Sequence, residues 1–234
     1  MTLNLNQNVL QKRVFKQQIL DLHIKEFMIG QTTPYLNPDK NTLDIGAATG
    51  MYASHFAKHS RNVYCFEAVP PVFNQLSKLK DTYKNLHTFN QAVSDKIGTA
   101  DFYVDDKRLS NSGFQNLVDG QKITVQTTTV DNFVQNKEID SIGFIKIDVE
   151  GNELDVLNGA VETIEEYKPT CMVEVYEKFN KYPVATTFDY FFSRGYKCFY
   201  NHRAQGLKLV KNLIEAMEAV KIPEITDGDF LFTL

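Results

Sequence analysis

One short segment, Asn41-Thr-Leu-Asp-Ile-Gly-Ala-Ala-Thr-Gly50, constrains the fold of this chain more than any other. It predicts a buried strand over residues 42–45, a turn of small residues over 46–50, and a helix over 51–58. A turn without bulky side chains lets a ligand lie against the backbone, and the amides that begin the following helix can face that ligand. Glu67 closes the next predicted strand about 20 residues after the turn, which is the spacing of a ribose-binding carboxylate in a βαβ nucleoside site.

The chemistry of this turn favours a cationic nucleoside. Ala48 stands where a dinucleotide-binding turn has its middle glycine, and no lysine follows the turn as in a P-loop. Asp44, just before the turn, repels phosphate but suits a sulfonium or an α-amino group, and S-adenosylmethionine carries both. We therefore expect Asp44 and the turn to hold the methionine half, and Glu67 to accept hydrogen bonds from both ribose hydroxyls. The alternative is a tight strand-to-helix turn with an acidic strand end and no ligand.

Length and charge narrow the class of protein. The chain has 234 residues, of which 43% are hydrophobic and 23% charged, as is typical of a soluble globular domain. Its net charge of −4 disfavours nucleic acid or an anionic membrane as partner. No apolar run approaches the ~20 residues of a membrane span, and the first residues lack the pattern of a signal peptide. The three cysteines form no CxxC pair, which indicates buried thiols and a cytoplasmic protein. The oligomeric state is not indicated.

The order of predicted elements favours an α/β fold with a mostly parallel seven-stranded sheet, an antiparallel C-terminal strand and helices on both faces. The predicted strands cover residues 42–45, 63–67, 86–92, 142–148, 170–176, 196–200 and 229–234. The predicted helices cover residues 8–29, 51–58, 70–83, 152–167, 188–194 and 210–220. For the helix at 152–167, Asn152 and Asp155 predict a capping pair.

Two alternating runs, residues 99–104 and 123–129, predict a small β insertion before the fourth parallel strand. Residues 1–40 are expected to form an N-terminal helical extension, and residues 41–234 the S-adenosylmethionine-binding domain. In an open parallel sheet, ligands bind beyond the carboxyl ends of the strands. The acidic and amide residues predicted at those ends are Asp44, Glu67, Gln91, Asp148 and Glu174.

In their order, these segments resemble the FkbM family of S-adenosylmethionine-dependent methyltransferases, which have the Rossmann-like class I fold. The most specific matching stretch is Phe144-Ile-Lys-Ile-Asp-Val-Glu-Gly-Asn-Glu153. The other matching stretches are Leu43-Asp-Ile-Gly-Ala-Ala-Thr-Gly50, Phe66-Glu-Ala-Val-Pro70, Gln91-Ala-Val-Ser-Asp95, Thr128-Thr-Val-Asp131, Lys168-Pro169, Val173-Glu174, Gly195-Tyr196 and Asp229-Phe-Leu-Phe232. The resemblance begins near residue 40 and runs to the C-terminus. It implies methyl transfer, most often to a hydroxyl oxygen of a sugar or natural product, with S-adenosylhomocysteine as the product of the cofactor.

The resemblance also implies roles for individual residues. The methionine part of the cofactor would be bound by Asp44, Gly46, Ala47 and Gly50, and the ribose by Glu67. Gln91 and Ala92 would flank the adenine, or simply pack at a strand end. Asp148, followed by Glu150, would lie beside the transferable methyl and either remove the acceptor's proton or orient the sulfonium. Favourable charge at a helix N-terminus is the structural alternative for these two acids.

Four further residues are candidates for the substrate side. Lys146 is a charge within an apolar strand and is expected to have a carboxylate partner. Glu174 lies at a strand end, and Ser110 and Ser112 belong to a polar stretch that suits a polyhydroxylated acceptor or is a solvated loop. No metal site is predicted, although Asp148 and Glu150 could contribute to one for Mg²⁺ or Ca²⁺.

These observations predict an O-methyltransferase that acts on a small-molecule or carbohydrate acceptor. Replacing Asp148 by Asn is expected to preserve cofactor binding and abolish turnover. Two other functions stay open on the sequence alone. One is an NAD-dependent oxidoreductase, which Ala48 and Asp44 disfavour. The other is a non-catalytic nucleoside-binding module of the same fold.

Overall fold

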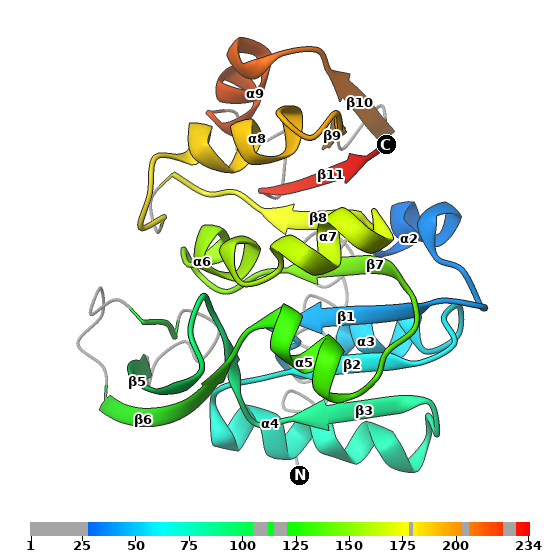
Figure 1. Cartoon of the computed structure of the whole chain (residues 1–234), viewed down its shortest axis with the longest axis vertical. Coiled ribbons are helices and arrows are strands. Elements are labelled where there is room, and N and C mark those ends of the chain that lie inside the picture. Colours follow the sequence, from blue (N-terminus) through cyan, green and yellow to red (C-terminus); the bar gives the residue numbers. More distant parts are fainter. Residues whose placement is uncertain (1–27, 105–111, 115–120, 178–179, 203–205, 222–227) are drawn as a thin grey trace, which may run out of the picture.

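A computed structural model of this chain describes residues 28–104, 112–114, 121–177, 180–202, 206–221 and 228–234. At its centre lies an eight-stranded sheet with the order β10-β9-β11-β8-β7-β1-β2-β3 (Figure 1). The strands are β1 (Asn41–Ile45), β2 (Val63–Phe66), β3 (Leu86–Phe89), β7 (Ile142–Ile147), β8 (Thr170–Glu174), β9 (Lys197–His202), β10 (Gly206–Val210) and β11 (Asp229–Thr233). The five strands from β3 to β8 pair in parallel, whereas β11 is antiparallel to both β8 and β9. This arrangement is the predicted Rossmann-like class I fold.

Helices cover both faces of the sheet. They are α2 (Met28–Thr32), η1 (Thr33–Tyr35), α3 (Met51–Phe56), α4 (Pro70–Leu76), η2 (Ser77–Asp81), α5 (Val130–Asn136), α6 (Glu153–Asn158), α7 (Val161–Tyr167), α8 (Val184–Phe192) and α9 (Leu213–Val220). The larger apolar core joins the sheet to helices α5 to α9, and the smaller one joins it to α3 and α4. Two buried faces explain why the central strands are almost continuously hydrophobic.

Alternation along the central strands decides which core each side chain enters. In β7, Phe144 packs into the smaller core, while Ile145 and Ile147 pack into the larger one. Lys146 follows the same alternation and therefore points toward α3, where its Nζ lies 5.1 Å from the ring centre of Tyr52. The register of the sheet pairs Lys146 with Asp44 of β1. The site described below depends on this pairing.

The predicted β insertion is confirmed as a separate three-stranded sheet, ordered β4-β6-β5. Its strands are β4 (Ala92–Val93), β5 (Gly98–Val104) and β6 (Gln121–Thr128). Tyr103 and Gly113 exchange two backbone hydrogen bonds of 2.8 and 3.0 Å, which bring residues 112–114 back against β5. The insertion therefore places a short returning segment next to the carboxyl edge of the main sheet.

Several details of the predicted elements were wrong, and helix α5 was not predicted. The main sheet has eight strands, because β10 adds an antiparallel edge beside β9. The third parallel strand ends at Phe89, because Ala92 and Val93 pair with β6 instead. The helix expected over 152–167 is broken into α6 and α7 near Gly159. A side chain at Gly159 would place its Cβ 2.3 Å from the carbonyl oxygen of Ser94, so the backbone passes too close there for any other residue.

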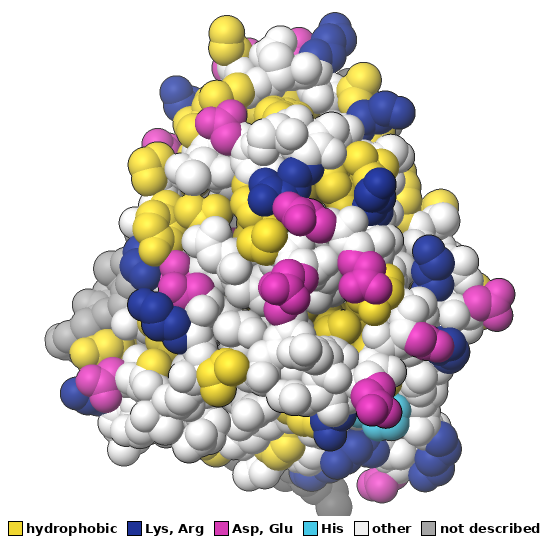
Figure 2. Space-filling view, viewed as in Figure 1, with side chains coloured by type: hydrophobic (Ala, Val, Ile, Leu, Met, Phe, Trp, Pro, Cys, Tyr) yellow, Lys and Arg dark blue, Asp and Glu magenta, His cyan; other side chains and the backbone are white. Residues whose placement is uncertain are grey.

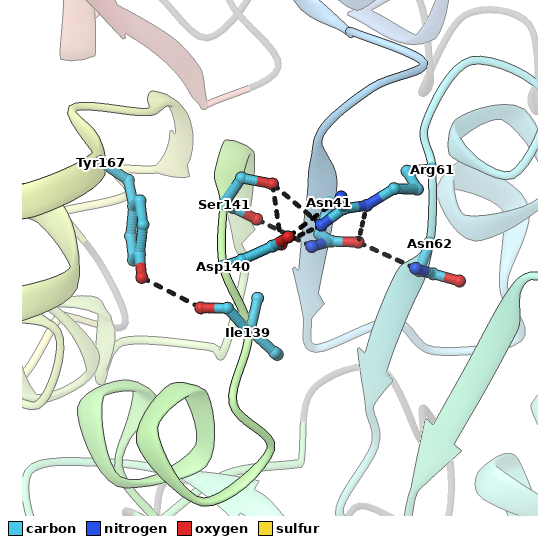
Figure 3. Close-up of polar contacts among 7 residues, drawn as sticks. All are labelled: Asn41, Arg61, Asn62, Ile139, Asp140, Ser141 and Tyr167. Carbon is cyan, nitrogen blue, oxygen red and sulfur yellow. Dashed lines mark hydrogen bonds and ion pairs between the residues drawn. The ribbon is translucent and has the colours of Figure 1, made fainter.

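A polar network at the opposite, amino-terminal edge ties the starts of β1, β2 and β7 together (Figure 3). Arg61 forms an ion pair with Asp140 and donates to the side chains of Asn41 and Ser141. Asn41 in turn donates to the carbonyl of Ser141 at 2.9 Å. The side chains at this edge bind one another and hold the starts of the three strands together.

Three expectations on the wider chain can be compared with the structure. Most of the predicted helix at 8–29 lies outside the described residues, which begin at Met28. Within the described ranges, no helix combines the length and the apolar character that crossing a membrane requires. The three cysteines are buried free thiols, as predicted.

Candidate active site

The glycine turn after β1 folds against the loop after β7. Gly46 has a φ of +77°, and a Cβ there would lie 1.7 Å from the carbonyl oxygen of Asp148. Gly50 has a φ of +90°, and its Cβ would lie 2.3 Å from Leu79. At Gly46, where the clash is with backbone, only glycine tolerates both conditions; at Gly50 the near atom is the end of a leucine side chain, and the positive φ is the stronger constraint. The amides of Gly46 and Ala47 donate to the carbonyl of Phe66, so this part of the turn is held by β2.

Glu67 lies directly opposite this turn. Its Oε2 accepts the N–H of Ala48 at 3.1 Å, and its Oε1 accepts the N–H of Val69 at 2.7 Å. Burial raises the pKa of Glu67, although these two N–H groups oppose the shift. Each carboxylate oxygen has a further lone pair available, because a carboxylate offers about four acceptor positions. A fixed carboxylate of this kind can bind a cis-diol.

A cavity of about 320 Å³ connects the turn, Glu67 and the loop after β7. Its polar lining includes Thr49, Glu67, Gln75, Gln91, Ser112, Asp148 and Glu150. Its apolar lining includes Phe66, Val69, Val72, Val93, Phe102 and Phe114. This volume is within the range of small-molecule sites, and an apolar wall with a few polar groups is their usual composition.

The predicted site residues fall into four groups in this geometry. Gly46, Glu67, Gln91, Ala92, Ser112, Asp148 and Glu150 line the cavity. Asp44, Ala47, Gly50 and Lys146 are not among its lining residues. Ala47 and Gly50 belong to the turn itself, whereas Asp44 and Lys146 are buried in β1 and β7. Ser110 lies outside the described residues. Glu174 is close to the acids of the cavity, as described below.

Lys146 has the carboxylate partners that the sequence predicts. Its Nζ lies 3.1 Å from Oδ2 of Asp148 and 3.8 Å from Oδ1 of Asp44, and it donates to the carbonyl of Gly46 at 3.3 Å. The side chain of Lys146 is 3% exposed and that of Asp44 is fully buried. Burial lowers the pKa of Lys146, but the charges of Asp148, Asp44 and Asp229 outweigh it and hold the pKa above its usual value. Burial raises the pKa of Asp44 to about 6, against the opposing charge of Lys146.

Three carboxylates meet beyond the ends of β7 and β8. Asp148, Glu150 and Glu174 each place an oxygen within 4.8 Å of the others. Burial, together with the charges of Asp148 and Glu153, raises the pKa of Glu150 to about 8. The pKa of Glu174 is raised by burial and then by Asp148 and Glu150. Oxygens this close suit a hard cation, but the ammonium group of Lys146 already supplies a positive charge at Asp148.

The loop that carries these acids is shaped by Glu153. Its Oε1 accepts the N–H groups of Val149 and Gly151 at 3.1 and 3.0 Å, and its side chain is buried. The capping pair predicted for Asn152 and Asp155 is wrong, because Asn152 makes no side-chain cap and Asp155 binds Lys181 and Tyr182. Glu153 instead binds the backbone N–H groups that precede the helix. The signal available in the sequence was that Glu153 ends the most specific FkbM-like stretch, residues 144–153.

The β insertion supplies a wall of the cavity that sequence analysis did not assign. Phe102 and Phe114 meet edge to face, with ring centres 5.3 Å apart. A Cβ at Gly113 would lie 3.5 Å from the carbonyl oxygen of Glu150, so the returning segment packs directly against the acidic loop. The alternating apolar residues of β5 are the pattern from which this wall could have been predicted.

Comparison with known proteins agrees with this geometry. The methyltransferase FkbM domain family matches residues 44–198. The hexuronic acid methyltransferase AglP of Haloferax volcanii is 24% identical over 149 residues, which cover 63% of this chain and 61% of that protein. The 2-O-methyltransferase NoeI of Sinorhizobium fredii is 28% identical over 145 residues, which cover 54% of this chain and 60% of that protein.

A solved structure shows the same fold. The crystal structure of methyltransferase FkbM from Methylobacillus flagellatus superposes with a TM-score of 0.54 at 16% identity, and it covers 84% of this chain and 44% of that one. The matched part of this chain spans about three fifths of the length of each curated relative, AglP and NoeI. Since the family match covers more than half of the sequence and includes the glycine turn, Glu67 and the acidic loop, this chain belongs to the FkbM family of methyltransferase domains.

Proposed function

We propose that this protein transfers the methyl group of S-adenosylmethionine to a hydroxyl oxygen of a carbohydrate or related small molecule. The observation that carries the proposal is the single cavity in which a diol-binding carboxylate, Glu67, and a pair of acids, Asp148 and Glu150, face the same space. The names of the two curated relatives, a hexuronic acid methyltransferase and a 2-O-methyltransferase, support a sugar acceptor.

The residues present fit this cofactor. Glu67 would accept hydrogen bonds from the ribose hydroxyls, and the glycine turn would lie against the methionine half. Gln91, Ala92 and the apolar wall formed by Phe102 and Phe114 would enclose the adenine. Asp44 is fully buried behind the turn and would not touch the cofactor; it would hold Lys146 in place. When bound, the cofactor supplies a methyl carbon made electrophilic by its sulfonium.

The remaining task of the chain is alignment and proton removal. The acceptor oxygen must lie in line with the methyl carbon at roughly 3 Å, and the loop after β7 borders the part of the cavity where this is possible. Asp148 and Glu150 there can orient the hydroxyl and take its proton. No step requires a charge that the described residues lack.

The test combines calorimetry with a transfer assay. Wild-type protein is titrated with S-adenosylmethionine, S-adenosylhomocysteine and NAD, and is then incubated with methyl glycosides of glucose, galactose, glucuronic acid and galacturonic acid. Glu67→Ala is expected to weaken binding of both S-adenosyl compounds. The double variant Asp148→Asn, Glu150→Gln is expected to bind them and to transfer no methyl group. Tight binding of NAD, or no binding of either S-adenosyl compound, would refute the proposal.

A further inference from the structure

We propose that Glu150 accepts the proton of the acceptor hydroxyl, and that Lys146 is a positioning residue that holds Asp148 beside the glycine turn. This inference rests on the proposed function and divides the roles of the two acids that the sequence treats as a pair. It reverses the expectation from the sequence, in which Asp148 was the principal base.

Asp148 is the acid already engaged by the protein. Its Oδ2 accepts from Nζ of Lys146 at 3.1 Å, and its backbone N–H donates to the carbonyl of Ile45 at 3.0 Å. Lys146 also donates to the carbonyl of Gly46. One buried ammonium group therefore fixes both the glycine turn and the first acid of the loop. A carboxylate held in this way is suited to orient a hydroxyl group.

Glu150 lacks any such partner among the described residues. Its carboxylate lines the cavity and takes part in no hydrogen bond or ion pair with them. Its backbone has a φ of +55°, a left-handed conformation that is unfavourable for a residue other than glycine. The buried Glu153 carboxylate maintains this conformation by binding the amides on both sides, those of Val149 and Gly151. The loop is thus built to present Glu150 to the cavity.

The charges around Glu150 come from each element packed against it. Asp148 and Lys146 come from the end of β7, Glu153 from α6 and Glu174 from β8. Three of these four groups are acidic, and Lys146 is bound to Asp148. A proton on Glu150 relieves the repulsion, so its carboxylate has a higher proton affinity than an exposed glutamate. A base of higher proton affinity removes a hydroxyl proton more effectively.

The step balances without another reactant. The hydroxyl oxygen forms a bond to the methyl carbon, the carbon–sulfur bond breaks with its electron pair left on sulfur, and the hydroxyl proton passes to the Glu150 carboxylate. Glu150 then releases this proton to solvent before the next turnover. Glu150 must be ionised at the start of the step, so kcat/KM for the cofactor should rise as the pH approaches about 8.

The experiment compares Glu150→Gln, Glu150→Asp and Asp148→Asn, using the methyl glycoside that wild-type protein methylates best. Glu218→Gln, on the exposed face of α9, is the control. Glu150→Gln is expected to lower kcat about 100- to 10,000-fold with little change in the affinity for S-adenosylhomocysteine, and to remove the rise with pH. Asp148→Asn should keep that rise but move it to lower pH, because one neighbouring charge is gone. Glu150→Asp should retain part of kcat.

A second readout does not depend on turnover. In free protein labelled with ¹³C at the glutamate carboxyl carbons, the resonance missing from Glu150→Gln should titrate far above an ordinary glutamate. The inference is overturned if that resonance titrates near pH 4.5, or if Glu150→Gln keeps the wild-type kcat while Asp148→Asn abolishes it. A wild-type protein that methylates none of the glycosides counts against the proposed function, whereas the titration of Glu150 in the free protein needs no turnover and tests this inference separately.

Discussion

The ammonium group of Lys146 lies between two carboxylates that are more than 100 residues apart in the chain, at 3.8 Å from Asp44 and 3.1 Å from Asp148. Asp44 and Lys146 are register partners on the neighbouring parallel strands β1 and β7. Asp148 follows Lys146 by two residues, just beyond the end of β7. Since Asp44 and Lys146 are almost completely buried, their charges compensate each other rather than being solvated.

Replacing Lys146 by Met should therefore destabilise the protein strongly. It leaves the fully buried carboxylate of Asp44 without its cation, which typically costs about 3 to 5 kcal/mol. The double variant Asp44→Asn, Lys146→Met should recover much of this loss, because it leaves no unpaired buried charge. Urea unfolding at pH 7 of the two single variants and the double variant measures this coupling. Additive losses in the double variant would contradict the pairing.

Replacing Gly46 by Ala should prevent correct assembly of the site. The new Cβ would lie 1.7 Å from a backbone oxygen of Asp148, and the backbone has a φ of +77°. Gly206→Ala is a matched control, because Gly206 has a φ of +72° and no described atom within 4 Å of the new Cβ. The control isolates the cost of the left-handed backbone, about 1 to 2 kcal/mol. Thermal unfolding should show a much larger loss for Gly46→Ala, and equal losses would show that the turn and the β7 loop can separate.

Stability should fall as the pH rises from about 5 to 8. The pKa is raised to about 6 for Asp44, about 7 for Glu153 and about 8 for Glu150. In this window the unfolded chain has released these protons while the folded protein retains them, so deprotonation favours unfolding. The raised pKa of Lys146 acts only at much higher pH, because its contribution is complete below the ordinary pKa of lysine.

Unfolding by urea at several pH values tests this expectation. The free energy of unfolding should decrease by roughly several kcal/mol between pH 5 and pH 8. Glu150→Gln should make the dependence shallower and stabilise the protein at pH 8, since an amide has no proton to lose. A free energy that increases over this range would contradict the assigned shifts.

Replacing Glu153 by Ala should loosen the acidic loop. The buried carboxylate oxygen of Glu153 accepts two backbone N–H groups, and without it both donors are left unsatisfied. The expected cost is about 2 to 4 kcal/mol of stability, at about 1 to 2 kcal/mol for each donor. Glu153→Gln keeps an acceptor oxygen of the same reach and should lose little. Hydrogen exchange of the Val149 and Gly151 amides locates the effect, and unchanged protection in Glu153→Ala would show that other contacts shape the loop.

On the face covered by α5, α7 and α8, acidic and basic side chains are interspersed (Figure 2). An extended basic surface, the usual electrostatic feature of nucleic-acid binding, is not seen on this one face.

The sequence by itself determined the fold class, the glycine turn, the position of Glu67 and the small β insertion. These features depend on local rules: hydrophobic periodicity, the backbone freedom of glycine and the spacing of a βαβ unit. Lys146 could also be predicted to need a carboxylate partner, because a lone charge in a buried strand is costly.

Only the tertiary structure decided which groups meet. Strand register joined Asp44 to Lys146, and the order of strands in the sheet brought Glu174 to Asp148 and Glu150. Close backbone approach at Gly159 divided one predicted helix into two, and the small sheet took Ala92 away from β3. These outcomes arise from contacts between segments distant in the chain, and a local pattern has no means to specify such contacts. The different roles proposed for Asp148 and Glu150 follow from the same cause, because only the folded sheet places a lysine beside one acid and further acids around the other.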